Sequence, residues 1–160
     1  MPDTVATNRI SAILKTGLIA GACDITCAMF HYLLRTGNNP LRILNYVASA
    51  VFGAEANEPG VGMLLLGLLF HFFIATMFAA FFFFIFPRIK LLSKNLIVSG
   101  VAYGVFVWLI MNLIVVPLSR IGRFPSNPVQ AAISLFIIII AIGLPVAILT
   151  YRYYINNSKR

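Results

Sequence analysis

The sequence is short of charge, and above all of negative charge. Only 10% of its 160 residues are charged, and 4 acids stand against 12 lysines and arginines. Soluble domains usually contain about 25% charged residues, whereas 61% of this chain is hydrophobic. This composition excludes an ordinary soluble domain and indicates a small integral membrane protein.

Catalytic motifs are also missing. The sequence contains no H-E-x-x-H, no G-x-S-x-G, no P-loop and no dinucleotide-binding fingerprint. Ser119 has no suitable base near it in the sequence, so a helix-capping or backbone contact is the better interpretation of its hydroxyl. We therefore expect a non-enzymatic protein without a resident cofactor.

Cysteine is scarce as well. Cys23 and Cys27 are the only two, and residues one helical turn apart rarely have the geometry of a disulfide. With His31 they could offer soft ligands to copper or zinc, which is one alternative. A second alternative is a haem held between His31 and His71, although these two residues are expected at different membrane depths.

Four long apolar segments remain once the polar stretches are set aside. Each is long enough to cross a bilayer, which takes about 20 residues. A shorter segment between the first two alternates apolar and polar residues at helical spacing and predicts an amphipathic helix at the interface. We predict a single all-α domain over residues 1–160. Its expected transmembrane helices are 12–34, 62–86, 95–118 and 129–153, and its interfacial helix is 41–53.

Basic residues are distributed unequally between the two sides of this topology. The side with both termini has eight and the opposite side has four, so the positive-inside bias places the termini in the cytoplasm. The eight are Arg9, Lys15, Arg88, Lys90, Lys94, Arg152, Lys159 and Arg160; the four are Arg35, Arg42, Arg120 and Arg123. We expect membrane lipids as partners, with Arg120 and Arg123 at head groups, and possible self-association or a second membrane protein, but no nucleic acid.

Asp24 is the most informative residue, because a carboxylate inside a membrane costs at least about 2.5–3.5 kcal/mol unless it is paired or protonated. In a helix it shares a face with the small residues Gly17, Ala20 and Gly21, and this face is predicted to point into the protein. Ile19, Ile25 and Phe30 are predicted on the opposite face.

His71 is expected at nearly the depth of Asp24. Counting inward from the ends of the predicted helices gives about 13–14 Å for His71 and about 15 Å for Asp24, at 1.5 Å per residue. A carboxylate–imidazole pair follows, and Asn112 could join it as an intramembrane polar cluster. The pair either fixes helix register or forms a proton- or ion-linked site.

Three further patterns bear on packing. Gly100 and Gly104 form a G-x-x-x-G pair, which favours close helix contact. Pro145 is expected to bend the last helix. The phenylalanines at 81–84 and 86 are expected mostly to face lipid.

Short motifs along most of the chain resemble small bacterial inner-membrane proteins of the YagU-like group. They are the stretch GLIAGACD at residues 17–24, Pro40 followed by residues 41–44 and 48–49, Gly67 with His71 and Phe72, and residues 117–119. The resemblance implies a multi-pass protein of the inner membrane and implies no reaction. We expect an accessory or assembly component that acts through helix–helix and lipid contacts, and the alternative is a small transporter or proton conductor that uses Asp24 and His71.

Overall fold

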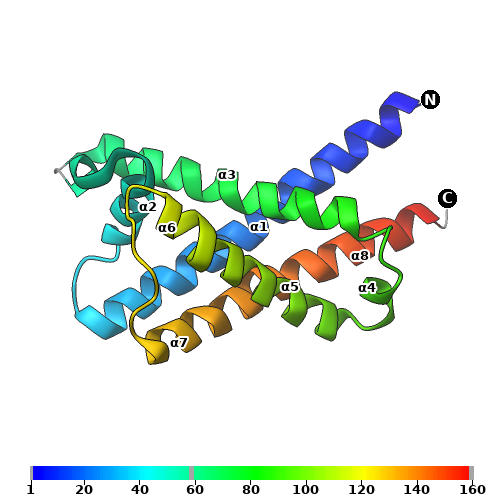
Figure 1. Ribbon diagram of the computed structural model, residues 1–160. Coiled ribbons are helices and arrows are strands. Elements are labelled where there is room, and N and C mark those ends of the chain that lie inside the picture. The colour runs from blue at the N-terminus through cyan, green and yellow to red at the C-terminus, as the bar shows by residue number, and fades with distance from the viewer. Residues whose placement is uncertain (1, 58–59, 159–160) are drawn as a thin grey trace.

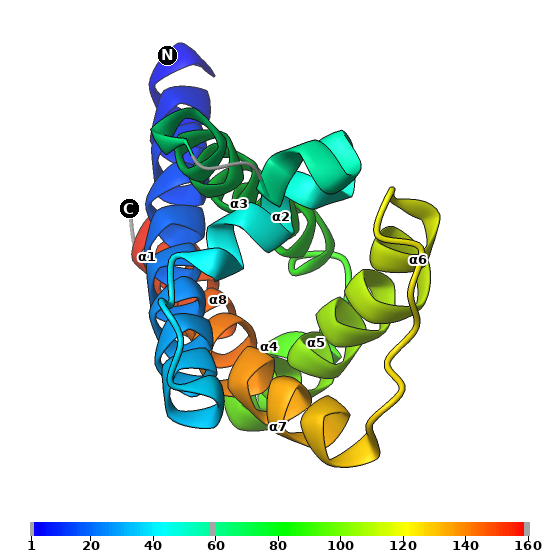
Figure 2. The same cartoon turned by 90° about the vertical axis from the view of Figure 1, so that its left-hand side faces the viewer.

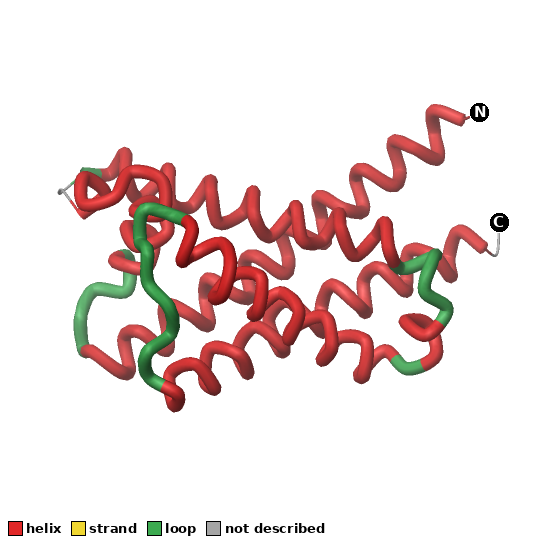
Figure 3. Tube along the Cα trace, in the orientation of Figure 1, coloured by secondary structure: helices red, strands yellow, loops and turns green. Residues whose placement is uncertain are grey.

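The computed structural model describes residues 2–57 and 60–158, and these residues form helices and loops without any strand. Four helical stretches are long and apolar enough to cross a membrane: Arg9–Thr36, Val61–Ile85, Leu96–Leu118 and Pro128–Asn157. A short helix lies between the first two (Figures 1 and 3). The predicted all-α class with four membrane-spanning helices and one intervening helix is therefore confirmed.

The helices are bounded as follows. The first span is α1 (Pro2–Thr36), and the short helix α2 (Arg42–Phe52) continues into η1 (Gly53–Asn57). The second span is α3 (Val61–Ile85), followed by the small α4 (Leu91–Lys94). The third span is α5 (Leu96–Ile110), η2 (Met111–Val115) and α6 (Val116–Leu118), and the fourth is α7 (Pro128–Ile138), η3 (Ile139–Gly143) and α8 (Leu144–Ser158). Helix α1 starts well before the predicted residue 12, and a proline suits a helix start.

The last span lies at the centre of the packing. Helix α1 packs along α3 on one side and along α8 and η3 on the other, while α5 packs along α8 and η3. Helix α2 folds back onto α3. Both termini lie at one end of the bundle, and α2 lies at the other (Figure 1). Seen from the α2 end, α1 and α6 stand on opposite sides of the molecule (Figure 2).

Asparagine caps start the last two spans. The side chain of Asn95 accepts hydrogen bonds from the backbone N–H groups of Ile97 and Val98, at 3.1 and 3.2 Å. Asn127 does the same for Val129 and Gln130, at 3.0 and 3.1 Å. These bonds satisfy N–H groups that a helix start leaves without intrahelical partners.

Two wide helical turns interrupt the last two spans, and each ends two residues before a proline. η2 precedes Pro117, and η3 precedes Pro145; in each turn a backbone N–H reaches back five residues. A proline ring clashes with the carbonyl four residues earlier, and one extra residue in the turn relieves that clash. Pro145 was predicted to bend its helix, and what the structure shows is a widened turn directly ahead of it.

Aromatic packing closes the terminal end of the bundle. Phe82, Phe83 and Phe86 are buried, so the prediction that this cluster mostly faces lipid is wrong for these three and holds for Phe81 and Phe84, which are exposed. The Phe82 ring lies 4.5 Å from that of Tyr103 on α5. Because successive residues of a helix point in different directions, a run of identical side chains cannot show which of them face inward.

Candidate functional site

The small residues of α1 form a tight seam with α3. A Cβ atom on Gly17 would come within 2.5 Å of the Thr76 hydroxyl oxygen, and one on Gly21 within 2.9 Å of the Phe72 ring. Ala20 is fully buried on the same face. The predicted inward direction of this stripe is confirmed at these positions, whereas Ile25, predicted on the lipid face, is only 8% exposed and was placed wrongly.

The imidazole ring of His71, on α3, is hydrogen-bonded to the backbone of α1 within this seam. Its Nε2 lies 2.9 Å from the backbone carbonyl oxygen of Gly21. A carbonyl oxygen only accepts, so Nε2 carries the proton and donates it. The hydrogen bond joins α1 to α3 directly and leaves the other ring nitrogen for a further partner.

Asp24 lies one helical turn beyond Gly21, half-buried, and close enough to His71 for their charges to interact. Within the described residues, no direct hydrogen bond or ion pair joins the two side chains. The structure thus brings together the predicted pair as neighbours, while the imidazole is bonded to backbone.

Asn112 has a different partner. Its side-chain amide donates to the carbonyl of Trp108 on its own helix at 3.1 Å, and the Trp108 indole donates to Ser134 on α7 at 2.8 Å. In the described part of the chain, no hydrogen bond joins it to Asp24 or His71.

The alternative metal ligands do not gather into a site among the described residues. Cys23 is an exposed free thiol, Cys27 is a half-buried one, and His31 is half-buried. Among the described residues, no three His, Cys, Asp or Glu side chains are placed to hold a metal ion. The arrangement gives the predicted alternative of Cys23, Cys27 and His31 as metal ligands no support.

A basic pocket lies at the opposite end of the molecule from the termini. It has a volume of about 750 Å³ and is lined by the end of α1, by α2 and by the loop between α6 and α7. All four arginines that the topology places on this side contribute to it. The lining residues are Tyr32, Arg35, Arg42, Ile43, Asn45, Tyr46, Ser49, Gly53, Ala54, Arg120, Ile121 and Arg123, with no acid among them.

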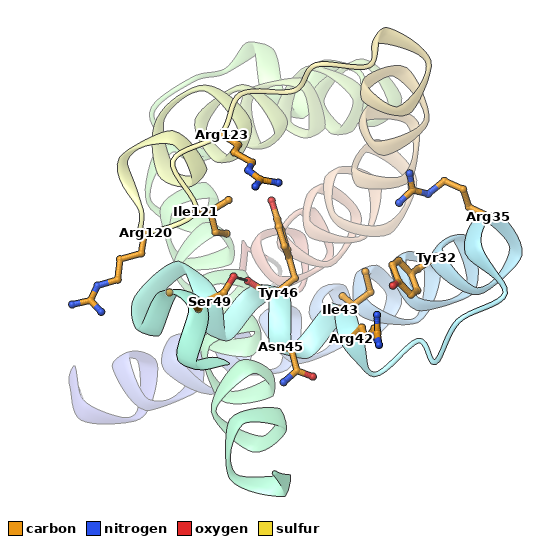
Figure 4. A pocket seen from close by; sticks show the side chains of 12 residues that line it. Tyr32, Arg35, Arg42, Ile43, Asn45, Tyr46, Ser49, Arg120, Ile121 and Arg123 are labelled. Atoms are coloured by element: carbon orange, nitrogen blue, oxygen red, sulfur yellow. Dashed lines mark hydrogen bonds between the residues drawn. The ribbon is translucent and has the colours of Figure 1, made fainter. Parts of the chain in front are cut away.

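The pocket arginines are arranged unequally. Arg35 and Arg123 extend into the same space from opposite walls, and the Tyr46 hydroxyl points toward Arg123 (Figure 4). Arg42 lies beside Tyr32, whereas Arg120 points away from the others (Figure 4). All four arginines are exposed, and within the described residues none of their guanidinium groups has a hydrogen-bond or ion-pair partner.

Tyr46 remains a neutral donor in this setting. Partial burial raises the pKa of its phenol, and the positive charge of Arg123 opposes that shift to a smaller extent. A neutral hydroxyl can donate a hydrogen bond to an anion, whereas a phenolate would repel it.

Backbone contacts hold α2 in place as one wall of the pocket. Gly67 on α3 approaches the Leu44 carbonyl so closely that a Cβ atom there would overlap it. The Asn45 side chain donates to the carbonyl of Ala56 at 2.5 Å, and the backbone N–H of Arg120 donates to that of Ala50 at 3.1 Å. The wall is thereby fixed before any ligand arrives.

Of the residues in this pocket, only Arg120 and Arg123 were predicted from the sequence as contacts of lipid head groups. The contributions of Tyr32, Arg35, Arg42 and Tyr46 depend on α2 folding back over α3, and no local pattern encodes that contact. The available signal was the count of bases, because every arginine of the side opposite the termini lines this one pocket.

Comparison with known proteins gives no match to a family model, to a curated protein or to a solved structure. The class that the fold defines is that of a small all-helical membrane protein with four helices able to span a bilayer.

Proposed function

We propose that the protein is a non-enzymatic multi-pass component of the inner membrane, with both termini in the cytoplasm. In this proposal it acts as an accessory or assembly protein through helix–helix and lipid contacts, and the Asp24–His71 pair fixes the register of α1 against α3. The excess of bases at the terminal end supports the orientation, and the resemblance to YagU-like proteins supports the inner membrane.

The observation that carries this proposal is the bond from His71 to the Gly21 carbonyl in a seam without free space. An ion-conducting site needs water along a path to its carboxylate. Here Gly17 and Gly21 leave no room for even one further carbon atom between the helices, and the imidazole proton is already donated to backbone. A closely packed polar contact of this kind favours a structural role.

The alternative, a proton conductor, is favoured by one specific observation: two ionisable groups interact within the membrane-spanning region. Buried ionisable residues in membranes are often functional. The two proposals differ in what Asp24→Asn and His71→Leu change.

The test measures proton flux and stability on the same preparations. Flux is followed with a pH-sensitive dye in proteoliposomes, and thermal unfolding in detergent. We expect background flux from the parent protein and a lower Tm for His71→Leu, because the Gly21 carbonyl loses its donor. The matched control is His31→Leu, a half-buried histidine with no hydrogen bond in the described part of the chain. Flux above that of empty liposomes that Asp24→Asn abolishes would overturn the structural role.

A further inference from the structure

The basic pocket brings together four arginines that no acidic side chain among the described residues pairs with. Four arginines line one cavity, no acid lines it, and within the described residues the four guanidinium groups lack protein partners. Charges of one sign around a cavity create a positive potential there, which attracts anions. Solvent and salt weaken this potential without removing it.

The type of side chain indicates the type of anion. A guanidinium group offers planar, paired N–H donors that match the oxygen atoms of a phosphate, and lysine lacks this geometry. All four bases of this side of the protein are arginines, whereas the terminal end has both lysines and arginines. Arg35 and Arg123 extend into the pocket from opposite walls, with Tyr46 as a neutral donor beside Arg123 (Figure 4). This set of donors fits the oxygen atoms of a phosphate group.

The size of the pocket indicates what the phosphate is attached to. A volume of about 750 Å³ lies within the range of small-molecule sites and leaves room beyond a bare phosphate ion. Ile43, Ile121 and the tyrosine rings offer apolar surface to an organic group. The pocket includes the end of the first spanning helix, at Tyr32 and Arg35, and the ends of spanning helices are where lipid head groups are expected.

We propose that this pocket binds a phosphate group carried on an organic ligand, either the head group of an anionic phospholipid or a soluble phosphate ester. Arg35 and Arg123 bind the phosphate oxygens from two sides, Tyr46 donates a hydrogen bond, and Arg42 and Arg120 raise the local positive potential. This site is distinct from the Asp24–His71 seam, and it does not depend on the role proposed for that pair.

The experiment uses the full-length protein and two probes. The soluble probe is glycerol 3-phosphate, titrated into detergent-purified protein by calorimetry. The lipid probe is phosphatidylglycerol, compared with phosphatidylcholine by native mass spectrometry of the protein released from mixed-lipid nanodiscs. Saturable binding of glycerol 3-phosphate identifies a soluble ligand, and selective retention of phosphatidylglycerol identifies a lipid.

Variants show whether the pocket is responsible. The double variant Arg35→Gln with Arg123→Gln removes the two guanidinium groups that extend into the pocket from opposite walls. Each charge-assisted hydrogen bond contributes enough for about a tenfold change in affinity, so we expect binding of whichever probe is bound to fall roughly a hundredfold. The charge-matched control, Lys90→Gln with Arg152→Gln, removes two positive charges at the terminal end, outside the pocket, and should bind within about threefold of the parent.

The folded state of each variant is checked by its thermal unfolding, and Arg35→Lys with Arg123→Lys separates charge from geometry. This variant keeps both charges without the paired donors and should bind between the parent and the glutamine variant. Equal affinity of the parent and the folded Arg35→Gln, Arg123→Gln variant for both probes would overturn the proposal. The proposal would also be overturned if the parent bound neither probe, or if the control variant lost as much affinity as the Arg35→Gln, Arg123→Gln variant.

Discussion

The two ends of the bundle both contain arginines, but they use them differently. At the terminal end, Arg9 donates to the Phe83 carbonyl at 3.3 Å and lies 4.6 Å over the centre of the Phe84 ring. Arg88 donates to the Phe84 carbonyl, and the Tyr154 hydroxyl to that of Phe83 at 2.8 Å. At the α2 end, the four guanidinium groups of the pocket have no such partners in the described part of the chain.

The difference separates a structural use of arginine from a binding one. The last carbonyl groups of α3 have no N–H partners within their own helix, and the negative end of the helix dipole attracts cations. Arg9 and Arg88 therefore bond to carbonyl groups at the end of α3, while the Nε atom of Arg9 is buried without a partner among the described residues. The guanidinium groups of the pocket have no hydrogen-bond or ion-pair partner within the described residues. They are therefore available to bind the anion proposed above.

The largest loss of stability is expected from a substitution in the wall of the pocket at the α2 end. Gly67→Ala should lower the free energy of unfolding by about 2 kcal/mol or more, because its Cβ would overlap the Leu44 carbonyl, and overpacking against backbone costs about 1–3 kcal/mol. Displacement of α2 should also weaken ligand binding in the pocket. Chemical denaturation in detergent measures the first effect and calorimetry the second.

Gly62→Ala provides the control for that variant. A Cβ atom on Gly62 has no neighbour within 4 Å, so stability should change little and rise slightly if at all. Equal destabilisation by Gly62→Ala and Gly67→Ala would show that α2 is not held at Gly67.

The next largest change in stability is expected from single substitutions of one arginine at each end. Arg9→Gln should lower the free energy of unfolding by about 1–2 kcal/mol, because it loses a charge-assisted hydrogen bond and a cation–π contact. Arg123→Gln should stay within about 0.5 kcal/mol of the parent, or become more stable at low salt as repulsion is relieved. Thermal unfolding at two salt concentrations distinguishes these outcomes, and a reversed order would remove the proposed contrast.

The smallest effect concerns pH. Arginine does not titrate in the accessible range, and the pKa of Tyr46 is raised by burial, so the phenol stays neutral as pH rises. Binding of sulfate, used here because its charge is constant over this range, should be unchanged from pH 7 to 9. It should weaken only above the usual tyrosine pKa of about 10, where a phenolate would repel the anion.

Tyr46→Phe is the control for the pH experiment. This variant should lose the decline at high pH and bind somewhat more weakly below it. A fall in sulfate affinity between pH 7 and 9 in the parent would mean that another titrating group lies in the site.

Composition and hydropathy predicted the class of fold and the short helix after the first span, because bilayer thickness dictates the length of an apolar helix. The glycines of α1 and α5 also indicated close contacts, and a Cβ on Gly104 would indeed come within 2.6 Å of the Ile139 backbone. What the sequence could not show is the direction in which a uniformly apolar helix faces, as Ile25 and Phe82 illustrate, since lipid and core are equally apolar.

The pocket was beyond sequence reasoning for another reason. Arg35 and Arg123 are distant in the chain and line the same pocket only because α2 folds onto α3 and the loop after α6 is bonded to α2. The number of arginines on that side of the topology indicated a positively charged surface. That they line a single pocket depends on the tertiary contacts, which the sequence does not show.

A crystal structure of the protein soaked with tungstate, a heavy analogue of phosphate, tests the central claim most directly. We predict an anomalous peak between the guanidinium groups of Arg35 and Arg123, beside the Tyr46 hydroxyl, and none against Arg9 or Arg88 at the terminal end. A peak at the terminal end with the pocket empty would contradict the account.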